Sequence, residues 1–267
     1  MAVGYKNVLG AKIYTVEAGV GDPILFLHGN PDTSDLWLYH IDKLKDKYRC
    51  IAIDTPGFGR SQIPYRFDFS KEAMIAFMDN LLWELDIKTK VTLIVHDLGG
   101  FYGLTYLAKY PEKVSRIGIF DTLYFTNYQW HFWANIWRTN AIGELSMAIM
   151  NYPLFLFELK RGSRKLSLAE IQKMYSYDSP NMRKAILDTY REFSPSKFEG
   201  WEDKMKSGVK NIPSFVAWGK HDPYIPVEFA YQFGSDNVHI LDCGHWTPAE
   251  EKEKSVELIQ KLFQEKI

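Results

Sequence analysis

Three short segments hold the residues whose types and spacing could do chemistry. They are His28-Gly29-Asn30-Pro31, His96-Asp97-Leu98-Gly99-Gly100, and Trp218 to Pro223 together with Cys243-Gly244-His245-Trp246. A carboxylate, with an ordinary pKa of about 3.9, is already charged at neutral pH and can attack a substrate without a general base. A histidine, with an ordinary pKa of about 6.5, can then activate water. These residue types suit a two-step hydrolysis in which a carboxylate attacks the substrate and a histidine then activates water.

Asp97 stands where the apolar run Val91–Val95 meets two glycines. An attacking carboxylate forms an ester, so it suits displacement at a saturated carbon that carries a leaving group, either a halide or the oxygen of a strained epoxide. Cleavage of an amide or ester would instead give an anhydride. The alternative is that Asp97 only caps the following helix, which is a common role for Asp.

Several other polar residues bear on this interpretation. Asp121 ends one predicted strand and Asp222 follows another, and either carboxylate could hold the second ring nitrogen of His245. His28 and His96 are expected to hydrogen-bond to the backbone and to shape loops. A metal site built from His28, His96 and Asp97 is not expected, because the chain has no His-x-x-x-His or comparable ligand spacing. We expect neither a metal nor a cofactor.

The elements that must position these segments alternate along the chain. The sequence predicts strands at 12–17, 24–28, 49–54, 91–95, 116–120, 213–219 and 238–242, and helices at 71–85, 101–110 and 248–263. Such alternation predicts a mostly parallel sheet covered on both faces, with ligands beyond the carboxyl ends of its strands. Residues 121–206 differ, because they are rich in Trp, Tyr and Phe and lack a β-branched strand; we expect a helical insertion over the sheet.

Composition limits the class of protein. The chain has 267 residues, 46% of them hydrophobic, which suits one α/β core with an insertion. A net charge of -1 without a basic stripe argues against nucleic acid and anionic membranes as partners. The two cysteines, Cys50 and Cys243, form no disulfide framework, and the N-terminus lacks the pattern of a signal peptide. We expect a cytoplasmic monomer or homodimer that binds a small apolar organic molecule.

The order nucleophile, acid, histidine resembles the α/β-hydrolase superfamily over nearly the whole chain. Val95 to Gly99 looks like its nucleophile elbow, with Asp97 where esterases carry Ser, and Asp54 to Ser61 is similar to the loop after its fourth core strand. The resemblance implies an α/β-hydrolase fold with core residues 1–121 and 207–267 and a helical cap at 122–206.

The same resemblance implies roles for individual residues. Asp97, His245 and Asp222 would be catalytic, because the Asp222 segment is similar to the usual acid loop, and Asp121 would be the alternative acid. The backbone N–H groups of Asn30 and Leu98 would form the oxyanion hole.

The leaving group divides two branches of this superfamily. His-Gly-Asn-Pro resembles haloalkane dehalogenases, in which the Asn side chain helps to hold the halide, but those enzymes carry Trp where this chain has Leu98. Fluoroacetate dehalogenases carry Arg there and again three residues on, where this chain has Leu98 and Phe101. Epoxide hydrolases are similar in the His before the nucleophile and use two proton donors in the cap.

Tyr190 matches the second of these cap donors, and His131, beside Trp130, is the candidate for the first. Because the Trp halide donor is missing, we predict an epoxide hydrolase that converts a small apolar epoxide to a diol. The alternative is a haloalkane or other organohalide dehalogenase. A non-catalytic ligand-binding protein on the same fold is the second alternative.

Overall fold

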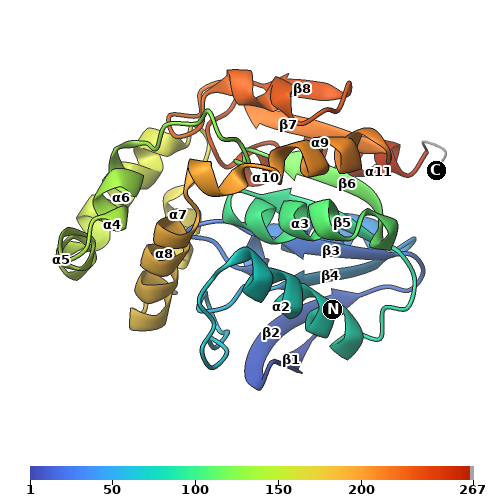
Figure 1. Cartoon of the computed structure of the whole chain (residues 1–267), viewed down its shortest axis with the longest axis horizontal. Helices are drawn as coiled ribbons and strands as arrows, with labels where there is room; N and C mark the ends of the chain where they lie inside the picture. The colour runs from blue at the N-terminus through green and yellow to red at the C-terminus, as the bar shows by residue number, and fades with distance from the viewer. Residues whose placement is uncertain (265–267) are drawn as a thin grey trace.

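The computed structural model describes residues 1–264. Its centre is an eight-stranded sheet with the strand order β1-β2-β4-β3-β5-β6-β7-β8 (Figure 1). The β1/β2 and β2/β4 pairs are antiparallel, and all the other neighbouring strands are parallel. The strands are β1 (Ala2–Val8), β2 (Ala11–Ala18), β3 (Pro23–Leu27), β4 (Arg49–Ile53), β5 (Val91–His96), β6 (Val114–Phe120), β7 (Ser214–Gly219) and β8 (Val238–Leu241).

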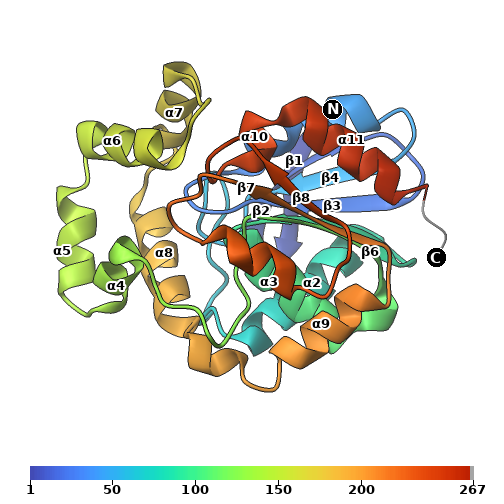
Figure 2. The same ribbon diagram turned by 90° about the horizontal axis from the view of Figure 1, so that it is seen from above.

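Helices cover both faces of this sheet (Figure 2). On one face α3 (Leu98–Lys109) packs against α2 (Lys71–Glu84) and α9 (Glu202–Lys210), and on the other α1 (Leu38–Leu44) packs against α11 (Lys252–Leu262). Every residue of β3, β5 and β7 is buried. Burial on both faces explains why these strands are continuous apolar runs and do not alternate with polar residues. The predicted α/β-hydrolase architecture is confirmed.

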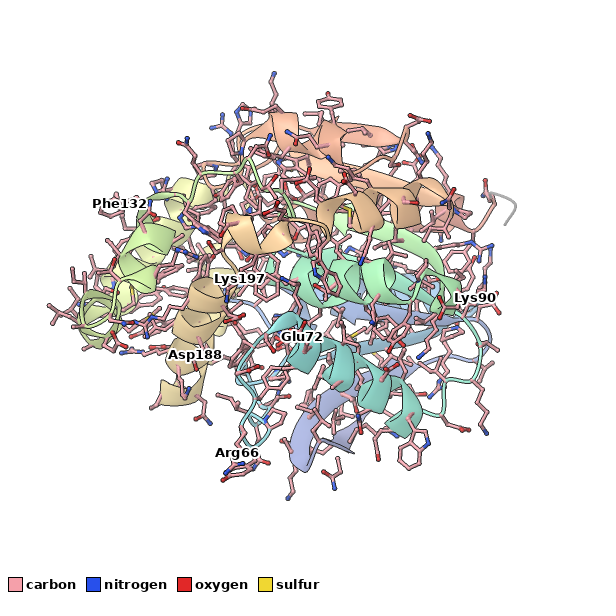
Figure 3. All side chains as sticks on the ribbon, viewed as in Figure 1. Arg66, Glu72, Lys90, Phe132, Asp188 and Lys197 are labelled. Carbon is pink, nitrogen blue, oxygen red and sulfur yellow. The ribbon has the colours of Figure 1, made fainter. Side chains whose placement is uncertain are left out.

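Of the six α-helices between β6 and β7, the first five lie to one side of the sheet in both ribbon views (Figures 1 and 2). They are α4 (Phe132–Arg138), α5 (Ile142–Ile149), α6 (Tyr152–Gly162), α7 (Leu168–Tyr175) and α8 (Pro180–Glu192), and the short 3-10 helix η3 (Pro195–Phe198) follows them. Phe132 is 70% exposed on their outer surface (Figure 3). The predicted boundary at residue 206 falls within α9, which packs on α3, so the division into core and cap stays a prediction.

Several elements differ from the sequence prediction, among them α1, which was not predicted. The edge strand β1 was not predicted, because its exposed residues give only a weak apolar signal. Helix α3 begins at Leu98, earlier than predicted, despite the low helix propensity of the two glycines in its first turn. The closing helix is two helices, α10 (Thr247–Glu250) and α11, because Glu251 has a non-helical backbone with φ -126° and ψ 53°. The remaining 3-10 helices are η1 (Ser34–Trp37), η2 (Pro111–Lys113) and η4 (Val227–Gln232).

Candidate active site

Asp97 occupies a sharp turn between β5 and α3. Its backbone is in an unusual region, with φ 45° and ψ -122°, and its side chain makes no capping hydrogen bond to α3. The turn requires small neighbours: a Cβ atom added at Gly99 would lie 2.3 Å from the carbonyl oxygen of Leu27. Thr122 Oγ1 donates a 2.6 Å hydrogen bond to the Asp97 carbonyl and supports the turn. The capping alternative is therefore wrong, and the strained geometry holds the carboxylate toward the cavity.

The Asp97 carboxylate is held by a backbone donor from the loop after β3. The N–H of Asn30 donates to Asp97 Oδ2 at 2.8 Å. Burial by itself raises the pKa of Asp97, but His245, His96 and the Asn30 N–H together outweigh burial and lower it. Leu98 is the first residue of α3, where a backbone N–H has no partner within the helix. The carboxylate is thus ionised at neutral pH beside the two predicted oxyanion donors.

His245 lies between two carboxylates. Its Nδ1 atom is 2.8 Å from Asp222 Oδ2, and its Nε2 atom is 3.8 Å from Asp97 Oδ2. Asp222 is itself oriented, because its Oδ1 atom accepts from the N–H groups of Tyr224 and Ile225 at 2.7 and 3.1 Å. Burial lowers the pKa of His245, but the attraction of Asp222 and Asp97 exceeds that effect and holds the pKa well above its ordinary value. The imidazole is therefore protonated at neutral pH.

Asp121, the alternative acid, is buried behind this pair. Its Oδ1 atom accepts from the N–H of Gly219 at 2.7 Å, and its Oδ2 atom has no hydrogen-bond partner within residues 1–264. Burial, and then the negative charge of Asp222, raise the pKa of Asp121 well above its ordinary value. The structure therefore joins His245 to Asp222 and leaves Asp121 as a neutral carboxylic acid.

The histidines His28 and His96 bond to the backbone, as expected. His28 Nε2 accepts from the N–H of Thr55 at 2.9 Å, and its Nδ1 atom lies 2.8 Å from the Gly29 carbonyl oxygen. His96 Nε2 donates to the carbonyl of His245 at 3.0 Å. Burial lowers the pKa of His96 to about 3, so that its ring is neutral. Both rings position the loops that carry the charged residues.

A cavity lies above Asp97 and His245 and is lined mainly by apolar side chains. Its residues come from the loops after β3, β5, β7 and β8 and from the inserted helices. Three charged residues, Glu158, Asp178 and Arg183, also line this cavity, although the sequence predicts an apolar ligand. Arg183 forms a salt bridge with Asp178, so two of these charges neutralise each other.

The four residues predicted to bind the substrate or its leaving group, namely Asn30, Trp130, His131 and Tyr190, all line this cavity. His131 caps α4 by accepting the N–H of Ala134 on its Nδ1 atom at 3.3 Å, so the neutral ring carries its proton on Nε2. Burial lowers the pKa of His131 to about 4, and burial followed by the charge of Asp97 raises the pKa of Tyr190. The rings of His131 and Tyr190 are 6.0 Å apart. At neutral pH both side chains can donate a hydrogen bond.

Sequence reasoning missed residues that complete the cavity wall. The Tyr224 ring lies 5.1 Å from that of His245 and 5.3 Å from that of His131, and Tyr128 donates its hydroxyl proton to the Tyr224 carbonyl at 2.9 Å. Tyr224 could have been noticed, since it follows Asp222 by two residues.

Two other features, a metal-binding cluster and a membrane-spanning helix, are absent from residues 1–264. Neither a cluster of three metal-ligating side chains nor a helix long and apolar enough to cross a membrane occurs among these residues.

The chain is similar to known proteins in family, sequence and fold. The profile of the alpha/beta hydrolase fold family matches residues 22–252. The chain is 26% identical to a cis-3-alkyl-4-alkyloxetan-2-one decarboxylase of Shewanella oneidensis, over 89% of this chain and 80% of that protein. It is 36% identical to a haloalkane dehalogenase of Agrobacterium fabrum, over 42% of this chain and 36% of that protein.

Among solved structures, the Cif epoxide hydrolase from Acinetobacter nosocomialis superposes with a TM-score of 0.84. Its sequence identity is 23%, with 98% of this chain and 88% of that chain covered. At this identity the likeness shows a shared fold.

Proposed function

The chain belongs to the alpha/beta hydrolase fold family, and from this premise we propose that it is an epoxide hydrolase that forms an ester on Asp97 and releases a diol. The core, residues 1–121 and 207–267, supplies Asp97, Asp222 and His245. The cap, residues 122–206, supplies His131 and Tyr190. The observation that carries the proposal is the pair of cap donors on the same cavity as the ionised Asp97, next to Leu98, whose side chain cannot hold a halide.

In the first step an Asp97 carboxylate oxygen attacks one ring carbon of the epoxide. A carbon–oxygen bond forms, the ring C–O bond breaks, and the epoxide oxygen takes a proton from Tyr190, with a second hydrogen bond from His131 Nε2. Both groups carry their protons at neutral pH, because burial raises the pKa of Tyr190 and leaves the His131 ring neutral. Positioned proton donors of this kind typically contribute about 10²–10⁴-fold in rate.

In the second step water hydrolyses the ester. Esterification removes the negative charge of Asp97, which is one of the two charges that raise the pKa of His245, so the imidazole loses its proton more readily. His245 Nε2 then takes a proton from water as the water oxygen bonds to the ester carbonyl carbon. The N–H groups of Asn30 and Leu98 stabilise the oxyanion, and collapse breaks the bond to the alkyl oxygen, which takes the proton from His245. The proton that His245 lost before this step restores the hydroxyl of Tyr190, and the Asp97 carboxyl passes its remaining water-derived proton back to His245.

The relatives support a strained or activated substrate. The oxetan-2-one in the name of the Shewanella relative is a four-membered oxygen ring, which is strained as an epoxide is. A haloalkane dehalogenase remains the second candidate, because the Asn30 side chain and the unpartnered, buried indole N–H of Trp130 line the cavity and could bind a halide.

The deciding experiment uses a His245→Ala variant, which should alkylate but not hydrolyse. We expect mass spectrometry to find an adduct on Asp97 after mixing with terminal epoxides, and the wild type to produce diol. Bromoalkanes, scored for free bromide, and an oxetan-2-one, scored for carbon dioxide, serve as parallel substrates. Turnover by His245→Ala without any adduct on Asp97 would contradict the mechanism, and bromide release without diol would favour the dehalogenase.

A further inference from the structure

A buried carboxyl group joins the loop that carries His245 to the inserted helices. Glu250, the last residue of α10, is 9% exposed. Its Oε2 atom accepts the backbone N–H groups of Arg164 and Lys165 at 2.7 and 3.0 Å, and that of Gly244 at 3.1 Å. Residues 164 and 165 lie in the turn between α6 and α7, whereas residue 244 directly precedes the histidine. One carboxyl oxygen therefore holds two segments that are far apart in the sequence.

The backbone brings the same two segments into direct contact. The N–H of His245 donates to the Gly162 carbonyl, at the end of α6, at 2.8 Å. A Cβ atom added at Gly244 would lie 2.2 Å from this carbonyl oxygen and 3.0 Å from Glu250 Oε1. Only glycine therefore fits between the turn, the loop and the carboxyl group without displacing one of them.

Side-chain packing fixes the His245 loop to the same helices. Trp246, the next residue, is 2% exposed and packs in an apolar cluster whose other buried members come from α6, α7 and the turn between them, namely Phe155, Leu159, Leu166, Ile171 and Met174. Asp222 holds the imidazole at Nδ1 from the other side. The histidine is thus oriented both by its side-chain partner and by the attachment of its loop to α6 and α7.

Ester hydrolysis depends on the position of His245 more than ester formation does. In the proposed first step, Asp97 is oriented by the N–H of Asn30 and the hydroxyl of Thr122, which belong to the loops after β3 and β6. In the second step, His245 Nε2 must reach a water that attacks the ester carbonyl carbon. Misplacing a catalytic group by about 1 Å can cost about 10²-fold in rate. A displaced His245 loop should therefore slow mainly hydrolysis.

We propose that Glu250 is a positioning residue: its Oε2 atom fixes the backbone of the His245 loop to the α6–α7 turn and so keeps the imidazole in place for ester hydrolysis. It acts through the N–H of Gly244, one residue before the histidine. This inference rests on the proposed two-step function, and it assigns Glu250 to the second step.

The test separates the two steps by rapid-mixing kinetics with a terminal epoxide, following the ester on Asp97 by quenched mass spectrometry. In Glu250→Ala three backbone N–H groups lose their acceptor. We expect ester hydrolysis to fall by about 10–100-fold while ester formation stays within about threefold of the wild type. The ester should therefore accumulate during turnover.

Glu250→Gln is the conservative variant that should restore hydrolysis. Its carbonyl oxygen can take the place of Oε2, and its amide can take the place of Oε1, which has no hydrogen-bond partner within residues 1–264. We expect it to hydrolyse the ester within about fivefold of the wild-type rate. Glu250→Met keeps the length of the side chain without a carboxyl oxygen, and should behave like Glu250→Ala even if the smaller variant folds poorly.

The matched control is Glu251→Gln, which removes a charge from the next residue. Glu251 forms a salt bridge with the side chain of Lys165 in the same turn, but this pair is partly exposed. Exposed pairs contribute little to stability, so the ratio of the two rates should not change.

Amide hydrogen exchange gives a readout that does not depend on activity. We expect the N–H groups of Gly244, Arg164 and Lys165 to exchange faster in Glu250→Ala than in the wild type, because they lose their common acceptor. The N–H of Asn30, which donates to Asp97, should exchange as in the wild type. Unchanged exchange at Gly244 would show that the carboxyl group does not hold the loop.

The kinetic outcomes distinguish this inference from the function on which it rests. If His245→Ala forms no ester on Asp97, the two-step function itself fails, and the inference fails with it. If the ester forms but Glu250→Ala and Glu250→Met hydrolyse it at the wild-type rate, only the role of Glu250 is overturned. An equal loss in both steps would also overturn that role, because it would indicate a general structural defect. So would a loss in Glu250→Gln as large as that in Glu250→Ala.

Discussion

The Nε2 atom of His245 lies 3.8 Å from the Oδ2 atom of Asp97, beyond hydrogen-bond distance but close enough for strong attraction between opposite charges. The consequence is mutual: this pairing helps to lower the pKa of Asp97 and to raise that of His245. The resting site therefore holds an imidazolium between two carboxylates, and anything that neutralises Asp97 changes the proton affinity of His245.

This relationship predicts a pKa shift in Asp97→Asn, whose neutral amide imitates the ester. We expect the pKa of His245, followed by NMR titration of its ring protons, to be lower in Asp97→Asn than in the wild type. An unchanged or higher pKa would contradict the coupling. His239, whose pKa is lowered by its own burial and by lysines elsewhere on the surface, should titrate alike in both proteins.

The raised pKa of His245 also predicts how stability depends on pH. The folded pKa lies above the unfolded value of about 6.5, so the protonated ring stabilises the fold fully below that pH. This contribution is lost as pH rises through the folded pKa. In urea unfolding at a series of alkaline pH values, the free energy of unfolding of the wild type should fall as the pH rises. The fall should be smaller in His245→Gln than in the wild type. Equal slopes in the two proteins would argue against the prediction.

Asp222 and Asp121 are predicted to respond differently to the same substitution. Asp222→Asn removes the carboxylate that holds His245 Nδ1, so we expect turnover to fall on the order of 10³-fold or more. Asp121→Asn replaces a carboxyl that is already neutral, and should change turnover by less than about tenfold. Steady-state kinetics on both variants, with folding checked by circular dichroism, make the comparison. A larger loss in Asp121→Asn would reverse the assignment.

The cap donors should matter for epoxides and not for bromoalkanes. Tyr190→Phe and His131→Phe each remove a hydrogen-bond donor from the cavity, and we expect the rate of ester formation from an epoxide to fall by about 10²-fold or more. Bromide leaves without a proton, so any release of bromide should change much less. Trp133→Phe lines the same cavity and serves as the control. Equal losses with both substrate classes would point to a role in binding or packing.

The substitution Gly99→Ala tests the packing beneath the nucleophile Asp97. A methyl group there would collide with the backbone of β3, whereas one at Gly4 would meet nothing within 4 Å. We expect Gly99→Ala to cost about 1–3 kcal/mol of unfolding free energy or more, measured by urea unfolding, and Gly4→Ala to be nearly neutral. Similar stabilities for the two variants would show that the strand and helix can separate cheaply at this point.

The sequence by itself determined the family and the chain order of the site. Apolar runs buried on both faces, such as Val91–Val95, predict parallel strands from local pattern alone. The turn residues after them must then gather at the carboxyl edge, and the resemblance to the α/β-hydrolase superfamily singled out Asp97 and His245 among them. The strand β1 was not predicted, because an exposed edge strand has little apolar pattern.

Only the tertiary structure decided which groups touch. Asp121 and Asp222 follow β6 and β7, which are neighbours in the sheet, so no sequence pattern separates their distances to His245. Loop conformation separates them: one carboxyl bonds to the Gly219 backbone, and the other reaches the imidazole. In the same way, the capping bond of His131 sets its tautomer. Proton positions depend on contacts that form only in the folded protein, so the residue types along the chain do not determine them.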